Sequence, residues 1–161
     1  MAAEVTMYMK IDGIDGNITA KGHEKWIQIY GMGFNVARSV SSNDPGNETD
    51  REASIPSFST IDIVKVMDET SPKLFLEVCL GGAKKVQIHL CHTGDNIQSF
   101  MEYTLTNVLF TDYNVRCNDG SHVESLSLNY TKLEMNYKTR TSADKQGTAI
   151  PAAYDLATAS K

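Results

Sequence analysis

The sequence contains no run of apolar residues long enough to cross a lipid bilayer, although hydrophobic residues make up 41% of it. Because a membrane-spanning helix needs roughly 20 consecutive apolar residues, we predict no membrane insertion. The opening residues, MAAEVTMYMK, also lack the basic and then apolar layout of a secretory signal peptide. We therefore expect the protein to be made and folded in the cytoplasm.

Cysteine and basic residues are both scarce. The three cysteines, Cys79, Cys91 and Cys117, are an odd number and follow no metal-binding or redox spacing. They fit reduced thiols in a reducing compartment, so we predict no structural disulfide. The 15 Lys and Arg residues are outnumbered by 20 Asp and Glu residues, which gives a formal net charge of −5. Because binding to a phosphate backbone needs a basic surface, we exclude nucleic acid as a partner.

Motifs that carry catalysis are absent as well. The sequence has no G-x-S-x-G nucleophile elbow, no H-E-x-x-H zinc motif and no P-loop. His89, Cys91 and His92 are the densest group of potential metal ligands, but on a strand His92 points away from the other two, and two ligands do not make a closed zinc site. His23 and His122 lie near turns and have no partner in the sequence that would make a dyad. We therefore predict neither an enzyme nor a metal or cofactor site.

What the sequence does contain is alternation of apolar and polar residues. Residues 5–11 place apolar side chains on one face of an extended segment, and residues 26–30 form a second predicted strand. Residues 86–91 and 101–106 alternate in the same way on either side of the turn signal TGDN at residues 93–96. This arrangement predicts a β-hairpin.

The last long apolar run changes phase. Leu126 and Leu128 share one face with Tyr130, whereas the next apolar residues fall at positions 133, 135 and 137, which predicts a bulge or bend near Thr131 and Lys132. Bends of this kind help a sheet to curl into a barrel. The length of 161 residues fits one domain over residues 1–161. We predict a mainly β fold, a small antiparallel β-barrel of two packed sheets with one short α-helix and a long extended loop.

One amphipathic helix of about ten residues is predicted after residue 70. Thr70 or Ser71 can cap it with a side-chain oxygen, and Pro72 occupies the first helical position. Gly81 and Gly82 can adopt the left-handed conformation that ends a helix. The residues at helical spacing that we expect to form the buried face are Leu74, Phe75, Val78 and Cys79. The preceding residues 62–68 fit either a helix or a strand.

Residues 39–56, SVSSNDPGNETDREASIP, depart from compact strand patterning. They are polar and contain the strong turn signal NDPG at residues 43–46. Long irregular loops in compact domains are usually either functional or disordered. The segment is therefore either a floppy surface loop or a functional one.

Several ordered segments that cover nearly the whole chain follow a recognisable pattern. They are KIDGIDG at Lys10–Gly16, GHEKWIQI at Gly22–Ile29, the D-x-x-S-P-x-L pattern of Asp68, Ser71, Pro72 and Leu74, LNYTKLEMNY at Leu128–Tyr137, and AAYDL at Ala152–Leu156. In this order they resemble the haemolysin-coregulated protein (Hcp) family, the tube subunits of bacterial type VI secretion.

The resemblance implies a structural protein that assembles with itself. Subunits of this family form homo-hexameric rings that stack into a hollow tube, hold effector proteins in the lumen, and are secreted without a signal peptide. The resemblance also implies a tip (spike) protein and a contractile sheath as partners. Family members extend a loop toward the neighbouring ring from the position of residues 39–56, so the resemblance implies that this segment is an interaction arm, whose base Ile55 would anchor. The ring-stacking residues expected here are Ser41, Ser42, Asn43, Asp44, Pro45, Gly46, Asn47 and Glu48.

The alternative from a different functional class is a monomeric β-barrel or sandwich that binds a small ligand or a glycan in the mouth of the barrel. Its candidate stacking residues are Tyr8, Trp26, Tyr30 and Tyr113. No distinctive motif supports it. The oligomeric state distinguishes the two hypotheses.

Overall fold

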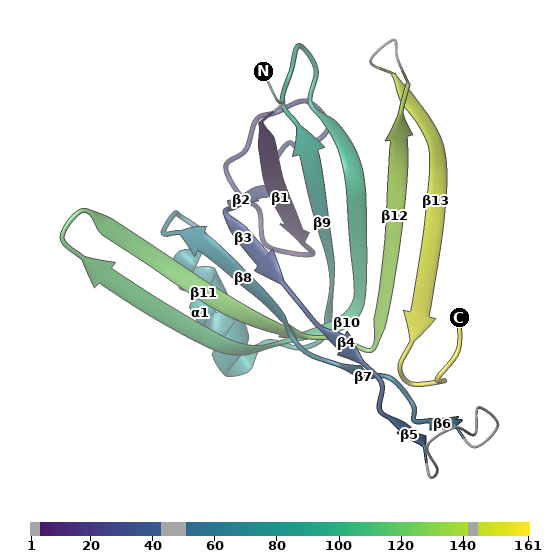
Figure 1. Ribbon diagram of the computed structural model, residues 1–161. Helices are drawn as coiled ribbons and strands as arrows, with labels where there is room; N and C mark the ends of the chain where they lie inside the picture. Colours follow the sequence, from purple (N-terminus) through teal and green to yellow (C-terminus); the bar gives the residue numbers. More distant parts are fainter. Residues whose placement is uncertain (1–3, 43–50, 142–144) are drawn as a thin grey trace.

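The computed structural model describes residues 4–42, 51–141 and 145–161, and these are almost entirely antiparallel β-structure (Figure 1). The alternating segments of the sequence form the strands, as predicted. The strands are β1 (Val5–Ile11), β2 (Ile27–Ile29), β3 (Gly31–Gly33), β4 (Val36–Ala37), β5 (Val40–Ser42), β6 (Arg51–Ala53), β7 (Ser57–Phe58), β8 (Ile61–Val66), β9 (Lys84–His92), β10 (Gln98–Asn118), β11 (Ser121–Asn129), β12 (Lys132–Arg140) and β13 (Gln146–Asp155). The helix α1 spans Ser71–Leu80.

Two packed layers share the long strand β10. The first half of β10 lies between β9 and β12, and its second half pairs with β11. The main path of neighbouring strands is β2-β1-β9-β10-β11-β8-β3, and β12 and β13 extend from β10. Since β2 and β3 flank Tyr30, whose N–H donates to the carbonyl of Val64 (2.8 Å), the segment 27–33 joins the two ends of this path. The predicted mainly β fold of packed sheets is confirmed.

The predicted bend at Thr131 and Lys132 is a break between two strands. β11 ends at Asn129, opposite Leu109 of β10, and β12 begins at Lys132, opposite Thr106. β10 itself carries the irregularity, with a shift of register against β9 between Leu105 and Val108. The change of hydrophobic phase therefore marks the place where the chain passes from one layer to the other.

The core between the layers is built from the inward-facing positions of the strands. On β8, the alternation of buried and exposed residues shows that the ambiguous segment 62–68 belongs mainly to a strand. Large side chains with almost no exposed surface include Met9, Ile11, Ile27, Ile29, Ile61, Ile63, Leu74, Ile88, Leu105, Leu126 and Leu128. These residues come from both layers and from α1, so one core supports the whole body.

Helix α1 has the predicted length but buries less than predicted. Leu74 is its one fully buried residue, Val78 is half-buried, and the side chains of Phe75 (52%) and Cys79 are exposed. The prediction of a four-residue buried face was wrong because α1 packs on the sheet mainly through Leu74. No helix among the described residues is both long and apolar enough to cross a membrane.

The ends of α1 also differ from the prediction. Thr70 is the N-cap residue, but its side chain makes no capping bond to the helix and its hydroxyl instead donates to the Asp68 carboxylate. Gly81, at the C-cap, has an extended backbone with φ of −69° instead of a left-handed one. Its N–H donates to the carbonyl of Glu77 (2.9 Å), which satisfies one terminal carbonyl of the helix.

A segment that we call the strap, residues 12–26, connects β1 to β2 and folds over the outer face of β1 and β9. It is held by its own backbone bonds, which include Gly16 N–H to Lys25 O (2.8 Å) and Lys25 N–H to Ile18 O (2.8 Å). Its own Trp26 packs with Tyr8 and Cys91 of the strands in a small apolar cluster that is separate from the main core. The strap therefore covers side chains that the strands alone would leave exposed.

Gly16 is predicted to be essential to the strap. A Cβ at this position would overlap the backbone carbonyl of Trp26. We expect Gly16→Ala to lower the free energy of unfolding by about 1–3 kcal/mol, the usual cost of overpacking. Urea denaturation measures the change. Gly33→Ala is the matched control because a Cβ at Gly33 meets no atom within 4 Å, and equal stability of the two variants would contradict the prediction.

Candidate assembly surfaces

The predicted loop 39–56 is in part an ordered stem. β4 pairs with β7, β5 pairs with β6, and together they form an arm that projects from the lower end of the body (Figure 1). Between these pairs, Ser39 and Ser54 exchange N–H···O bonds of 2.9 and 3.1 Å. The prediction of a long irregular segment was wrong for these residues, because they pair in two successive β-ladders. The strands of these ladders are shorter than typical strands.

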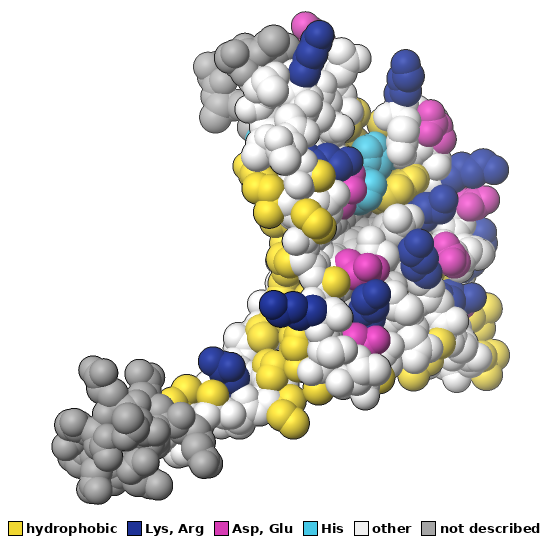
Figure 2. Space-filling view, turned by 90° about the vertical axis from the view of Figure 1, so that its right-hand side faces the viewer, with side chains coloured by type: hydrophobic (Ala, Val, Ile, Leu, Met, Phe, Trp, Pro, Cys, Tyr) yellow, Lys and Arg dark blue, Asp and Glu magenta, His cyan; other side chains and the backbone are white. Residues whose placement is uncertain are grey.

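The predicted ring-stacking residues fall in two groups. Ser41 and Ser42 belong to β5 of the arm. The others, Asn43, Asp44, Pro45, Gly46, Asn47 and Glu48, lie outside the described residues. Figure 2 shows the arm from the side, standing clear of the body. Ring stacking through these residues stays a prediction.

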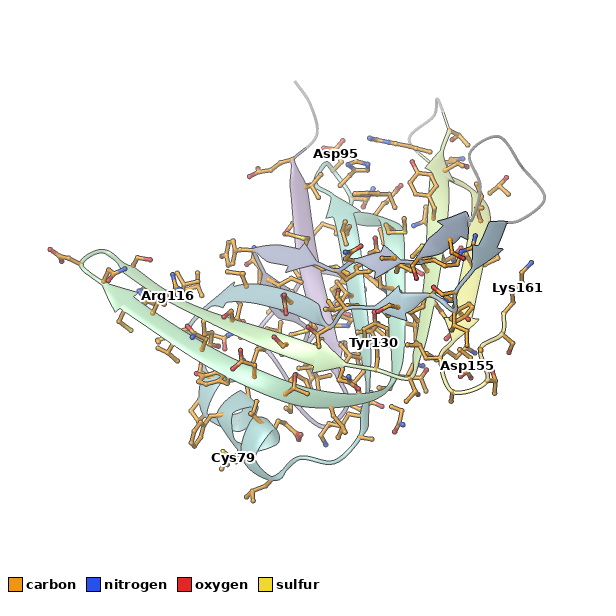
Figure 3. The ribbon with its side chains drawn as sticks, turned by 60° about the horizontal axis from the view of Figure 1, so that its bottom comes forward. Cys79, Asp95, Arg116, Tyr130, Asp155 and Lys161 are labelled. Carbon is orange, nitrogen blue, oxygen red and sulfur yellow. The ribbon has the colours of Figure 1, made fainter. Side chains whose placement is uncertain are left out.

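Aromatic residues anchor the base of the arm. Phe58 stacks on Tyr154 of β13, with 5.3 Å between ring centroids, and meets Tyr130 edge to face at 6.4 Å. The hydroxyl of Tyr130, which lies where β11 leads into β12 (Figure 3), donates to the carbonyl of Ser59 (3.0 Å). Ile55, the anchor predicted from the sequence, is instead 74% exposed. The arm is thus fastened to both the body and the C-terminal strand.

Strand β13 forms an edge of the larger layer. It pairs with β12 over its whole length, and the described residues place no strand on its other side. Most of its side chains are exposed, including Ile150. A long exposed edge presents backbone N–H and C=O groups that can pair with another chain. β13 is therefore a candidate surface for association.

The D-x-x-S-P-x-L motif lies beside a buried ion pair. Lys65 Nζ is 2.5 Å from Glu124 Oε1 and 3.1 Å from Asp68 Oδ1, and the side chains of Lys65 and Glu124 have no exposed surface. Ser71 Oγ donates to the same Glu124 oxygen (2.9 Å). The buried Lys65–Glu124 pair is thus bonded to the start of α1. These bonds fix the orientation of the helix on the sheet.

The remaining members of the motif complete this arrangement. The N–H of Asp68 donates to Ser71 Oγ (3.1 Å), Pro72 lies in the first turn of α1, and Leu74 enters the core. Tyr113 of β10 donates its hydroxyl to Glu124 Oε2 (2.6 Å). Burial, and then the hydrogen bond to Glu124, raises the pKa of Tyr113 to about 12. The motif therefore attaches the helix to the sheet.

Sequence reasoning missed Lys65 and Glu124, although a signal for them exists. Lys65 continues the inward positions of Ile61 and Ile63, and Glu124 continues those of Leu126 and Leu128. A charge on a buried face of a strand is unusual unless it is paired. The two residues stand directly opposite each other in the β8–β11 register.

His89 and His92 point to opposite faces of β9, as strand geometry predicts. His23 has a partner that the sequence did not indicate. His89 and Cys91 face the strap, whereas His92 stacks on Phe100 with 4.3 Å between ring centroids. His23 of the strap contacts both His89 and Cys91. In the part of the chain that the structure describes, no three His, Cys, Asp or Glu side chains are arranged to hold a metal.

The four aromatic residues suggested for ligand stacking are not gathered in one place. Tyr8 is buried under the strap and Trp26 is buried at the end of the strap itself, whereas Tyr30 is exposed between β2 and β3 and Tyr113 is bonded to Glu124. A stacking platform needs accessible ring faces that converge. The glycan-binding hypothesis therefore loses its proposed site.

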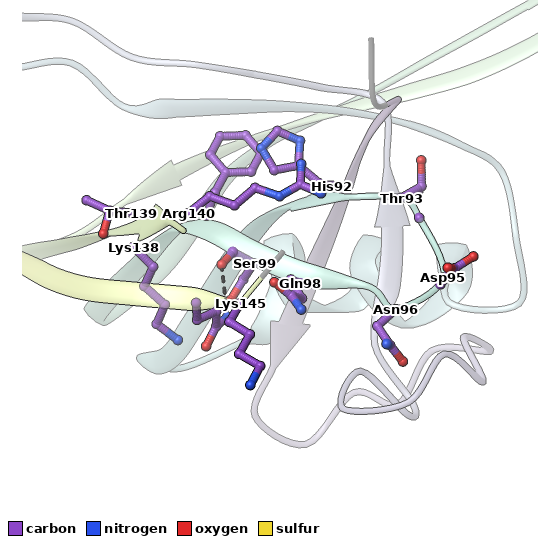
Figure 4. Close-up of a pocket in the computed structure, with 13 residues that line it drawn as sticks. His92, Thr93, Asp95, Asn96, Gln98, Ser99, Lys138, Thr139, Arg140 and Lys145 are labelled. Atoms are coloured by element: carbon purple, nitrogen blue, oxygen red, sulfur yellow. Dashed lines mark hydrogen bonds between the residues drawn. The ribbon is translucent and has the colours of Figure 1, made fainter. Parts of the chain in front are cut away.

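A polar cleft of about 340 Å³ lies between the β9–β10 turn and the ends of β12 and β13 (Figure 4). Gln146 Nε2 donates to the carbonyl of Ser99 (3.1 Å), and Lys138 Nζ contacts Glu102 Oε1 (2.6 Å). The polar lining of the cleft differs from the mostly apolar walls of small-molecule sites.

Comparison with known proteins identifies both a family and a fold. The family model described as type VI secretion system effector, Hcp, matches residues 8–137. The solved structure titled "Structure of a type six secretion system protein" has a TM-score of 0.86 and 22% identity, covering 96% of this chain and 98% of the other. None of the curated proteins matches the sequence.

Two further solved structures are similar over nearly their whole length. Hcp1 from Salmonella typhimurium has a TM-score of 0.73 and 20% identity, covering 98% of this chain and 97% of its own. A type VI secretion system effector from Yersinia pestis has a TM-score of 0.72 and 24% identity, covering 92% of this chain and 98% of its own. These similarities show that the chain shares their fold.

Proposed function

This chain belongs to the Hcp family of type VI secretion system proteins, and we propose that it is a structural subunit of the secretion tube. In this proposal six copies close into a ring, rings stack into a hollow tube, and effector proteins travel in the lumen. The subunit leaves the cytoplasm with the tube, without a signal peptide. Its partners are other copies of itself, effectors, a tip protein and a contractile sheath. The whole chain acts as one domain, and its role is structural rather than enzymatic.

The observation that carries the proposal is the exposed edge of β13 on a chain that matches the family. A ring of identical subunits uses a heterologous interface, in which one surface of a subunit meets a different surface of the next. β13 offers backbone groups along ten residues for such a contact. When the ring closes, the backbone N–H and C=O groups of every β13 edge gain partners. In an isolated subunit these groups face solvent.

Size-exclusion chromatography with multi-angle light scattering tests the ring. We expect a mass near six times 17.8 kDa. A stable monomer at micromolar concentration would overturn the ring in solution and favour a binding module that acts alone. A ring with a different number of subunits would support a closed assembly but contradict the hexamer.

The arm supports stacking because it projects beyond the body at the end opposite the β9–β10 turn (Figure 1). We expect deletion of residues 43–50, with β5 and β6 rejoined by a short turn, to leave the ring intact and to weaken stacking at least tenfold. Native mass spectrometry measures the ring, and sedimentation velocity across a concentration series measures the stacks. A second variant keeps the length but replaces residues 43–50 with glycine and serine.

The two arm variants distinguish a requirement for the length of residues 43–50 from a requirement for their specific contacts. If both variants lose stacking, residues 43–50 contribute specific contacts. If only the deletion loses it, length alone is required. Loss of the hexamer in either variant would place the arm in the ring interface and contradict its assignment to stacking.

A further inference from the structure

The strap is held against the sheet by a direct contact between two imidazoles. His23 Nε2 lies 2.9 Å from His89 Nδ1 of β9. The side chains come from positions far apart in the sequence, and His23 is only 5% exposed. Trp26 packs on both rings, with 4.8 Å between its centroid and that of His23 and 4.4 Å to His89. The pair is therefore enclosed by aromatic side chains on the outer face of the sheet.

The second nitrogen of each ring determines which one donates. His89 Nε2 faces Glu102 Oε1 at 4.0 Å, which favours a proton on that nitrogen. His89 Nδ1 is then the acceptor, and His23 Nε2 is the donor. His23 Nδ1, which is buried and without a hydrogen-bond partner, is left bare. Each ring carries one proton in this arrangement, so both are neutral.

We propose that the strap is a pH-sensitive clasp, closed while the His23–His89 pair is uncharged and released when acid protonates it. One extra proton turns a neutral hydrogen bond into a buried cation. A second proton places N–H groups on both nitrogens of the contact, and two donors cannot bond to each other. The 2.9 Å contact is then replaced by repulsion between two cations.

Several charged or titratable groups face the pair. From β10 and the strap, Glu102 and Glu24 favour protonation of the rings, and the backbone of Lys21 also favours the charged form of His23. From β12, Lys138 opposes protonation of His89, and its ion pair with Glu102 (2.6 Å) reduces the effect of that carboxylate.

Two neutral groups complete the surroundings of the pair. From β9, Cys91 Sγ lies 3.7 Å from His23 Nε2, and burial raises the pKa of this thiol to about 11. From β1, the ring of Tyr8 lies 5.0 Å from that of His23 between centroids. Neither group supplies a negative charge to stabilise a protonated imidazole.

Burial determines the direction of the pH effect. It lowers the pKa of His23 from 6.5, and it lowers the pKa of His89 to about 4. Between these values an opened strap binds protons more readily than a closed one. The closed strap is therefore fully stable above about pH 6.5 and loses stability as the pH falls toward 4.

Trp26 reports on the clasp because it is the one tryptophan of the sequence and touches both rings. Between pH 6.5 and 4 we expect its fluorescence to change in a single reversible transition. Far-UV circular dichroism should stay constant through that transition, since the sheets remain folded. Simultaneous loss of both signals would mean global unfolding and would overturn the proposal of a local clasp.

Substitution of the imidazoles distinguishes a proton sensor from simple packing. If the pair is the sensor, His89→Gln and His23→Gln move the fluorescence midpoint to lower pH by at least one unit or abolish it. If the histidines only pack, these less stable variants open at higher pH, and the proposal fails. His122→Gln, on the exposed start of β11, is the matched control and should leave the midpoint unchanged.

Opening itself is measured at Cys91. In a Cys79→Ser, Cys117→Ser background, the buried Cys91 is the remaining thiol. We measure the labelling of Cys91 by 4,4′-dithiodipyridine relative to labelling of the urea-unfolded protein at the same pH, because the thiolate fraction itself changes with pH. On this scale we expect Cys91 to react at least tenfold faster at pH 4.5 than at pH 7.5. A fluorescence transition without faster labelling would show protonation under a closed strap, which contradicts release.

Discussion

Replacing Lys65 with methionine is expected to lower the free energy of unfolding by about 3–5 kcal/mol, the usual cost of leaving a buried charge without its partner. The side chains of Lys65 and Glu124 have no exposed surface, and their 2.5 Å contact is the centre of the network at the start of α1. Methionine fills the same volume but provides no positive charge. The Glu124 carboxylate would then keep only the hydroxyl donors of Ser71 and Tyr113.

Urea denaturation measures this effect, and two comparisons test its cause. Lys73→Met, on the exposed side of α1, removes the same charge and should change stability by less than about 0.5 kcal/mol. The double variant Lys65→Met, Glu124→Gln should recover at least about 1 kcal/mol relative to the sum of the single variants. If Lys65→Met is no less stable than Lys73→Met, the buried pair does not stabilise the fold.

The second large effect is expected at Leu74. This residue is fully buried between α1 and the sheet, so Leu74→Ala removes apolar contacts and leaves a cavity. We expect a loss of about 2–5 kcal/mol in the free energy of unfolding. Leu76→Ala is the matched control because Leu76 is 53% exposed on the same helix. Thermal and urea denaturation of the isolated protein should therefore rank the Leu74 variant well below the Leu76 variant.

Phe75 connects these stability predictions to assembly. It is 52% exposed and touches Tyr113 edge to face at 6.1 Å, so Phe75→Ala should cost less than Leu74→Ala. If the Phe75 and Leu76 variants keep their stability but lose the ring, the exposed side of α1 belongs to a subunit interface. A loss of stability as large as that of Leu74→Ala would contradict the exposure seen for Phe75.

On the face of the molecule that Figure 2 presents, charges of both signs are mixed, which fits the proposed assembly through strand edges better than assembly through one charged patch. Figure 2 shows positive and negative side chains interspersed over the face that it presents, with histidine beside them. Like-charged patches steer partners of opposite sign, whereas mixed charge keeps a surface soluble. The exposed edge of β13 and the arm are therefore the features of the described residues on which the proposed association would depend.

The sequence by itself determined the local structure and the family. Alternation at residues 5–11 and 86–106 predicted β1, β9 and the start of β10, and the turn signal between them located the hairpin. Pro72 and Leu74 in the D-x-x-S-P-x-L motif located α1. These features depend on neighbours within a few residues, so periodicity and turn chemistry are enough to predict them.

Only the tertiary structure decided which distant residues meet. The register of β8 against β11 places Lys65 opposite Glu124, and the fold of the strap brings His23 onto His89. The packing of α1 through Leu74 leaves Phe75 exposed, and the pairing of β12 with β13 makes β13 an edge. A local pattern tells which face of an element is apolar, but the partner of that face is chosen by long-range pairing and packing, whose energies are summed over the whole chain.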